Sequence, residues 1–286
     1  MAPPHGINTK DPEAVAEVAR KVFETVGAKE SRPLIDRLFA DVTRMFRGEY
    51  PGYLPIDMFY HDYEHTLQAT VCLLQILEGR HRTGIRPVLS PRDHELALMA
   101  VLLHDSGYLK RTDDTAGTGA KYTLIHVERS CDFARTYLPP LGVKPAELDD
   151  IAHGISCTGP VNKFNVVPFR RPESRLIACI LVTADYLGQM SAADYVDELP
   201  ILYREFVEAY DFAQIPEDKR VFKGEHQIIK QTPAFWEKYV KPMLTVDAGA
   251  VYRYADHPDG SNPYMDAVEA NIAEVRRAVD SGHPVA

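Results

Sequence analysis

Long apolar segments are missing from this chain of 286 residues, and so is an excess of positive charge. The longest apolar runs, 96–103 and 176–184, are far shorter than the roughly 20 residues of a membrane-spanning helix. The first ten residues contain no apolar segment of a secretory signal. Lysine and arginine number 32 against 41 aspartates and glutamates, which disfavours broad contact with a nucleic-acid backbone. We therefore expect a cytoplasmic protein that binds neither a membrane nor a nucleic-acid polymer.

Cysteine is also scarce, and its spacing excludes the common zinc and redox motifs. The chain has four cysteines and no CxxC pair. Two of them fall within apolar helical patterns, where a thiol packs as a small apolar group. We expect reduced, buried thiols at all four positions rather than disulfides. The four are Cys72, Cys131, Cys157 and Cys179.

The sequence also lacks the pattern of a half-buried β-strand, because no segment shows a strong alternation of polar and apolar residues. Apolar residues instead recur every three or four positions, and Pro or Gly clusters separate the periodic segments. We predict an all-α fold with three parts: N-terminal helices in 1–50, a core in 51–190, and C-terminal helices in 191–286 that extend the same domain. The expected helices cover 11–26, 31–46, 61–80, 91–107, 121–137, 145–155, 172–189, 192–210, 224–244 and 264–279.

Two carboxylates occur where the pattern calls for apolar residues. The run 96–103 is apolar around the whole helix and is followed by His104-Asp105. Asp185 follows Leu181 and Ile177 by one and two turns in a second apolar helix. A buried carboxylate is costly unless it is paired or bound to a metal. Asp105 could also be solvated at a helix end, and Asp185 could be paired with Arg, Tyr or backbone groups.

Histidines near these positions could supply further ligands. The sequence YHDYEH places His61 and His65 four residues apart, which on a helix means one shared face. His126 and His153 lie in two later helical segments, between His104 and Asp185. Each of these histidines taken alone could equally be packed or solvent-exposed.

This ordered set resembles the H…HD…D signature of the HD superfamily of metal-dependent phosphohydrolases, over about residues 60–188. The resemblance implies an HD-domain-like helical bundle in which His65, His104, Asp105 and Asp185 hold a divalent metal ion. Some branches of the superfamily bind a second metal through two further histidines. His126 and His153 occupy that interval, so the sequence is similar to the binuclear H…HD…H…H…D form, with Asp105 bridging two divalent ions (Mn, Mg, Fe or Zn).

The implied reaction is hydrolysis of a nucleotide-like phosphomonoester or phosphodiester by attack of a metal-bound hydroxide. YHDYEH is also similar to the Tyr-His-Asn-x-x-His motif of cyclic-nucleotide phosphodiesterases, with Asp62 in place of Asn. That likeness implies that His61 protonates the leaving oxygen while Asp105 belongs to the catalytic metal site. A histidine, whose pKa is ordinarily near 6.5, suits this role at neutral pH.

A small anionic substrate, such as a phosphoester, needs further polar contacts. Lys163, Arg171 and Gln189 lie close in sequence to the later ligands and are candidate substrate-binding residues, although solvated loop charges are the alternative for the two cations. The same ligand pattern also serves di-iron oxygenases that act on small polar substrates, and a metal-stabilised sensor domain without catalysis is a third hypothesis. A homo-oligomer is compatible with the sequence.

Overall fold

The computed structural model describes residues 6–159 and 163–281 and contains ten α-helices in these ranges. Apart from one isolated bridge between Tyr53 and Arg111, the described ranges hold no β-structure. The predicted all-α fold is therefore confirmed. The helices are α1 (Pro12–Thr25), α2 (Arg32–Arg47), α3 (Tyr63–Thr83), α4 (Pro91–Leu103), α5 (His126–Tyr137), α6 (Pro145–Ser156), α7 (Pro172–Met190), α8 (Tyr195–Phe212), α9 (Glu225–Phe235) and α10 (Pro263–Ser281).

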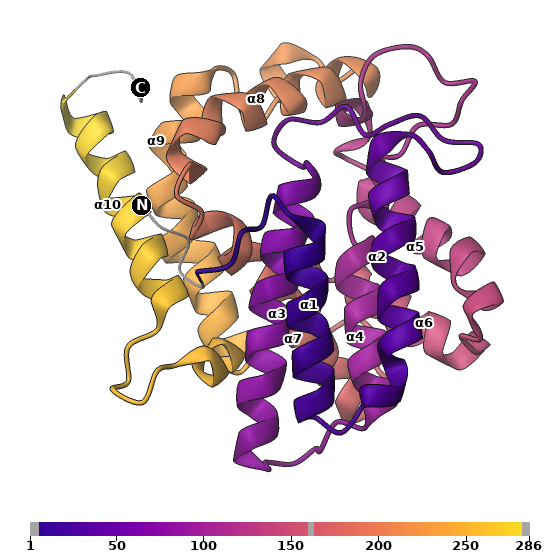
Figure 1. The fold of residues 1–286 in the computed structure, drawn as a ribbon. Helices are drawn as coiled ribbons and strands as arrows, with labels where there is room; N and C mark the ends of the chain where they lie inside the picture. The colour runs from indigo at the N-terminus through magenta and orange to yellow at the C-terminus, as the bar shows by residue number, and fades with distance from the viewer. Residues whose placement is uncertain (1–5, 160–162, 282–286) are drawn as a thin grey trace.

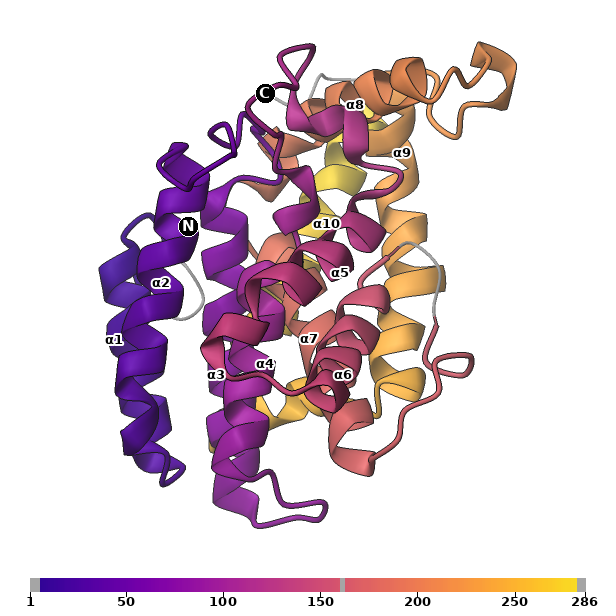
Figure 2. The same ribbon diagram turned by 90° about the vertical axis from the view of Figure 1, so that its right-hand side faces the viewer.

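Helices α3, α4 and α7 form the centre of the bundle (Figure 1). Both apolar runs noted in the sequence, in α4 and α7, are buried almost completely. A helix that is apolar all round needs neighbours on every side. Figure 2 shows α1 and α2 along one side of α3 and α4, while α5 and α6 cover another face.

Helix α3 packs against α7 at unusually close range because Gly188 has no side chain. A Cβ atom added at Gly188 would lie 2.7 Å from the backbone nitrogen of Ala69 and 2.9 Å from its Cα. Both neighbours are backbone atoms, which cannot rotate away as a side chain can. The glycine therefore sets the distance between the two helices, one of which carries His65 and the other Asp185.

The C-terminal helices pack against the centre of the bundle rather than forming a separate layer of their own. Helix α10 packs against α7, α8 and α9. The buried amide of Asn271 in α10 donates to the backbone oxygens of Met190 and Ala192, at 2.9 and 2.8 Å. These two residues form the turn between α7 and α8, so α10 holds that turn in place.

Among the described residues, no single helix combines the length and apolar character that crossing a membrane requires. Helices α7 and α8 meet these criteria only when taken together, and they are bent by 109° at their junction.

Several predicted helix boundaries are wrong, and local hydrogen bonds explain the differences. Helix α3 begins at Tyr63 rather than at 61, because the Asp62 carboxylate accepts from the backbone N–H of His65 and caps the helix. His61 therefore lies outside the helix. The segment from 121 does not continue into α5: Gly119–Tyr122 forms a 3₁₀ turn, and α5 starts at His126.

Two serines that stand directly before helices make different contacts. Ser90 caps α4 in a reciprocal pair of contacts with Asp93. Ser31 stands before α2, but its hydroxyl donates to Glu95 at 2.5 Å instead of capping the helix. The helix expected over 224–244 ends at Phe235 and continues as two π-helical turns, Trp236–Val240 and Met243–Asp247.

Candidate metal centre

The His104-Asp105 pair lies where α4 ends and the chain turns into a short 3₁₀ helix, Ser106–Tyr108. His104 is bound through its Nδ1 atom to the carbonyl oxygen of Val101 at 2.7 Å, which leaves Nε2 without a proton to donate in the neutral ring. The turn is anchored to α5, because the backbone N–H of Gly107 donates to the Ser130 hydroxyl at 2.8 Å. The fold thus fixes both side chains before any ligand binds.

Three helices bring four of the predicted ligands together. His65 Nε2 lies 3.2 Å from Oδ2 of Asp105 and 3.3 Å from Oδ1 of Asp185. His104 Nε2 lies 3.3 Å and 3.4 Å from the same two oxygens. The two Nε2 atoms are 3.3 Å apart. One ligand atom each from His65, His104 and Asp185 falls within 4.8 Å of the others, a spacing that could hold a metal ion.

Asp105 has a second neighbour on its other oxygen. Oδ1 lies 3.6 Å from Nε2 of His126, the first residue of α5. The His126 ring is oriented by a 2.7 Å contact between its Nδ1 atom and the carbonyl oxygen of Thr123. Asp105 therefore lies between His65 and His104 on one side and His126 on the other. This is the placement expected of a bridging carboxylate.

The electrostatics of the cluster favour a bound cation. Burial lowers the pKa of His65, but the adjacent carboxylates of Asp105 and Asp185 outweigh it and raise the pKa to about 10. Burial raises the pKa of Asp185, and His104 and His65 reverse this and bring the pKa down to about 2. The pKa of Asp105 is held well below its usual value in the same way. A proton on the histidines or a metal ion can supply the positive charge that these carboxylates require.

An unsatisfied atom also points to a missing partner. Oδ2 of Asp105 is buried and forms no well-aligned hydrogen bond, although the Nε2 atoms of His65 and His104 lie 3.2 and 3.3 Å from it. Buried carboxylate oxygens ordinarily accept hydrogen bonds or bind a cation. The ligand types, two imidazole nitrogens and two carboxylates with a third imidazole next to one of them, suit Mn²⁺, Fe²⁺ or Zn²⁺. The residues present therefore fit a divalent metal ion.

His61 approaches this cluster from the loop before α3, and its ring stands 5.8 Å from that of His65. Its Nδ1 atom is 2.6 Å from Oε2 of Glu205, a buried residue in α8. The other oxygen of Glu205 accepts from the backbone N–H groups of Phe59 and Tyr60 at 3.2 and 2.8 Å. The carboxylate thus fixes both the loop and the ring, so that Nδ1 of His61 carries the proton and Nε2 is left for another partner.

Glu205 was not predicted from the sequence, although a signal was present. Ile201 and Leu202 lie about one turn before it and Ala209 one turn after it. A carboxylate flanked in this way lies on an apolar face of the helix, which is the pattern that identified Asp185. The sequence cannot indicate that its partner lies 144 positions earlier in the chain.

The remaining predicted residues have different positions. The amide nitrogen of Gln189 lies 3.4 Å from Nδ1 of His65, at the edge of the cluster. Arg171 instead pairs with Asp93 and Asp150, at 2.9 and 3.4 Å. Asp93 is in the first turn of α4, at the opposite end of that helix from His104, so Arg171 is not brought to the cluster and its prediction as a substrate-binding residue is not supported.

His153 and Lys163 have no contact with the cluster among the described residues. His153 is half-buried in α6 with its ring 6.1 Å from that of Phe169, and its buried Nδ1 atom has no hydrogen-bond partner. Lys163 is half-buried in the loop before α7. Their roles as second-metal ligand and substrate-binding residue stay predictions.

Comparison with known proteins adds no assignment. The chain matches no model of a known protein family, and no curated protein aligns with it significantly. The geometry of the cluster and the sequence resemblance are therefore the basis on which a function is assigned.

Proposed function

We propose that this protein is a metal-dependent phosphohydrolase that cleaves a small phosphomonoester or phosphodiester. The observation that carries the proposal is the meeting of His65, His104, Asp105 and Asp185 around one buried point, with a sequence order that resembles the HD superfamily. In this proposal these four residues hold one divalent ion. Asp105 and His126 are the residues available to a second ion.

A divalent ion bound there would activate a water molecule and offset the negative charge of a phosphate. The chain's own contribution is to position groups around that point. The five ligand candidates come from α3, α5, α7 and the end of α4, so packing in the bundle fixes their relative positions. Burial excludes most water from the cluster and strengthens its electrostatic interactions.

His61 supplies the proton for the leaving oxygen in this proposal. The Glu205 carboxylate holds the Nδ1 proton, so a protonated His61 ring has only its Nε2 proton to give. Tyr108 stacks against the ring at 4.9 Å between centroids and limits its rotation. Proton transfer by a positioned side chain typically accelerates a reaction by about 10²- to 10⁴-fold.

The test is hydrolysis of phosphoesters by protein stripped of metal and then supplied with Mn²⁺ or Mg²⁺ under anaerobic conditions. The panel contains p-nitrophenyl phosphate, bis-p-nitrophenyl phosphate, and cyclic and linear nucleotides. We expect metal-dependent release of phosphate or nucleoside monophosphate, and loss of at least about 10²-fold in Asp185→Asn, which removes a ligand charge. Asp132→Asn, at an exposed position of α5, is the matched control and should keep full activity.

Two results would contradict the proposal. Turnover that requires O₂ would identify an oxygenase. If Asp185→Asn kept full activity on the substrate that the wild-type protein hydrolyses, the metal cluster would have no part in the reaction.

A further inference from the structure

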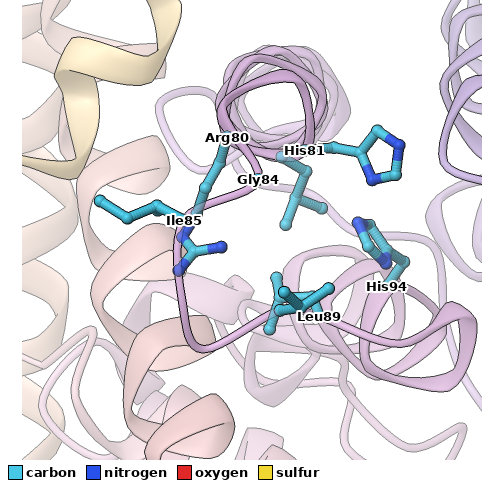
Figure 3. Close-up of a pocket in the computed structure, with 8 residues that line it drawn as sticks. Arg80, His81, Gly84, Ile85, Leu89 and His94 are labelled. Carbon is cyan, nitrogen blue, oxygen red and sulfur yellow. The ribbon is translucent and has the colours of Figure 1, made fainter.

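A pocket of about 150 Å³ lies far from the metal cluster, at the other ends of α3 and α4. Arg80 follows His65 by fifteen residues on α3, which at 1.5 Å per residue places it roughly 22 Å away. Neither Asp nor Glu is among the residues that line this pocket in the described part of the chain. Figure 3 shows its main lining residues, Arg80, His81, Gly84, Ile85, Leu89 and His94.

Arg80 is the unusual member of this group, because it is a buried cation without a counterion. The residue is 4% exposed, and its Nε atom is buried with no hydrogen-bond partner. No carboxylate pairs with it in the described residues; its guanidinium carbon lies 5.6 Å from the ring centre of Tyr254, whose side chain is a neutral hydrogen-bond partner and not a counterion. Burial lowers the pKa of Arg80, and Tyr254 only partly offsets this. A buried, unpaired guanidinium is costly to keep, so its presence indicates an anionic partner.

The geometry directs this charge into the pocket. Figure 3 shows the guanidinium group of Arg80 extending from α3 toward Ile85 and Leu89, with His81 and His94 on the opposite side. Several other arginines of this protein have carboxylate partners: the neighbouring Arg82, for example, pairs with Glu78 at 3.5 Å. Arg80 thus differs from Arg82 both in burial and in having no acid beside it.

The surroundings of Arg80 define the charge and size of its partner. Arg80 is the one permanent cation of the pocket lining in the described structure, and burial lowers the pKa of His94, which favours its neutral form. A single positive charge matches a monoanion, and a guanidinium fork matches the two oxygens of a carboxylate. Leu77, Ile85 and Leu89 supply apolar walls. A pocket of about 150 Å³ has room for a body about the size of benzene.

We propose that this pocket binds a small organic monocarboxylate, with its carboxylate paired to Arg80 and its apolar body against Leu77, Ile85 and Leu89. The proposal does not depend on the proposed hydrolase activity, because the two sites share no residue. Since α3 and α4 carry residues of both sites, a ligand bound here contacts the helices that position His65 and His104.

The test is isothermal titration calorimetry of the full chain with sodium butyrate, benzoate, acetate and inorganic phosphate at constant ionic strength. We expect butyrate or benzoate to bind more tightly than acetate because of the apolar walls, and more tightly than phosphate because of the single charge. Arg80→Met should weaken binding of the preferred carboxylate at least tenfold. Arg82→Met, an exposed neighbour on the same helix, is the matched control and should leave it unchanged.

A second pair of variants keeps the test decisive if Arg80→Met does not fold. Ile85 is 50% exposed in a loop, so polar residues are tolerated there. Ile85→Asp places a carboxylate at the mouth of the pocket and should weaken binding at least tenfold relative to Ile85→Asn, which has the same shape without the charge. The proposal is overturned if the wild-type chain binds none of the carboxylates, if phosphate binds most tightly, or if Ile85→Asp and Ile85→Asn bind equally. Binding that persists in Asp185→Asn would separate this site from the metal cluster.

Discussion

The close approach of α3 and α7 at Gly188 provides a direct test of how the bundle positions the metal ligands. In Gly188→Ala the new Cβ would stand 2.7 Å from the backbone nitrogen of Ala69, about 0.7 Å short of ordinary contact. Because the neighbours are backbone atoms, the helices must separate. Overpacking of this kind costs about 1–3 kcal/mol, and the better helix propensity of alanine returns up to about 1 kcal/mol. We expect a net loss of about 1–2 kcal/mol in the free energy of unfolding.

The same separation should weaken metal binding, since α3 carries His65 and α7 carries Asp185, whose ligand atoms are 3.3 Å apart. A shift of several tenths of an ångström between two ligands should lower the affinity for Mn²⁺ by about 10- to 100-fold, the range found when groups that orient metal ligands are altered. Urea unfolding in EDTA measures the stability change without metal, and calorimetric titration with Mn²⁺ measures the affinity.

Gly154→Ala is the matched control, because this buried helical glycine also faces α7. Its added Cβ would meet only a side-chain carbon of Leu181 at 3.6 Å and the Cα of Ala178 at 4.0 Å, which is ordinary contact. We expect no loss of stability and unchanged metal affinity. If Gly188→Ala and Gly154→Ala have the same free energy of unfolding and the same affinity for Mn²⁺, the contact between α3 and α7 does not set the geometry of the cluster.

Three further changes have defined outcomes. Glu205→Gln should lower turnover of any phosphoester substrate about 10- to 100-fold with little change in Mn²⁺ affinity, because it weakens the hydrogen bond that orients His61 without removing a metal ligand. An equal loss of turnover and of Mn²⁺ affinity would contradict this positioning role. Saturating Mn²⁺ at about 100 times its dissociation constant should stabilise the stripped protein by about 2.7 kcal/mol, a rise of roughly 4–5 °C in Tm for 286 residues, whereas Asp185→Asn should show almost no rise. Hydrogen bonds from Arg92 lower the pKa of Glu147 to about 2 from the usual 4.5, so the pair's stabilisation is present above pH 4.5 and is lost as the pH falls toward 2. Urea unfolding should therefore show Glu147→Gln less stable than wild type by about 1–2 kcal/mol at pH 7, with the difference shrinking in acid; a constant difference would exclude an electrostatic origin.

The helices and the residues at the centre of the cluster could be predicted because the sequence marks them locally. Asp105 and Asp185 can be recognised because each follows a run of buried apolar residues. The spacing between Ser90 and Asp93 is typical of a helix start and marks the beginning of α4. Such signals depend on neighbours within one or two helical turns. The confirmed all-α fold rests on the same kind of information.

Relations between distant segments could not be predicted in this way. The four-residue spacing predicts one helix for His61 and His65, but the side chain of Asp62 caps the helix so that it begins after His61. Arg171 is a candidate substrate-binding residue by its place in the sequence, whereas in the structure it pairs with Asp93, 78 positions earlier. Which acid meets which base is decided by how the helices pack, and a single sequence contains no direct record of that packing.

The contact between Glu205 and His61 determines the smallest fragment of this protein that would retain the complete candidate site. All the predicted metal ligands lie before residue 190, so a fragment cut there would retain every one of them. It would lose α8, and with it the carboxylate that orients His61. It would also lose Asn271, which secures the turn leading into α8. The C-terminal helices are thus inseparable from the site in any exchange of segments between proteins, and a transplant of residues 51–190 alone would carry the candidate ligands without the carboxylate that orients His61, the proposed proton donor.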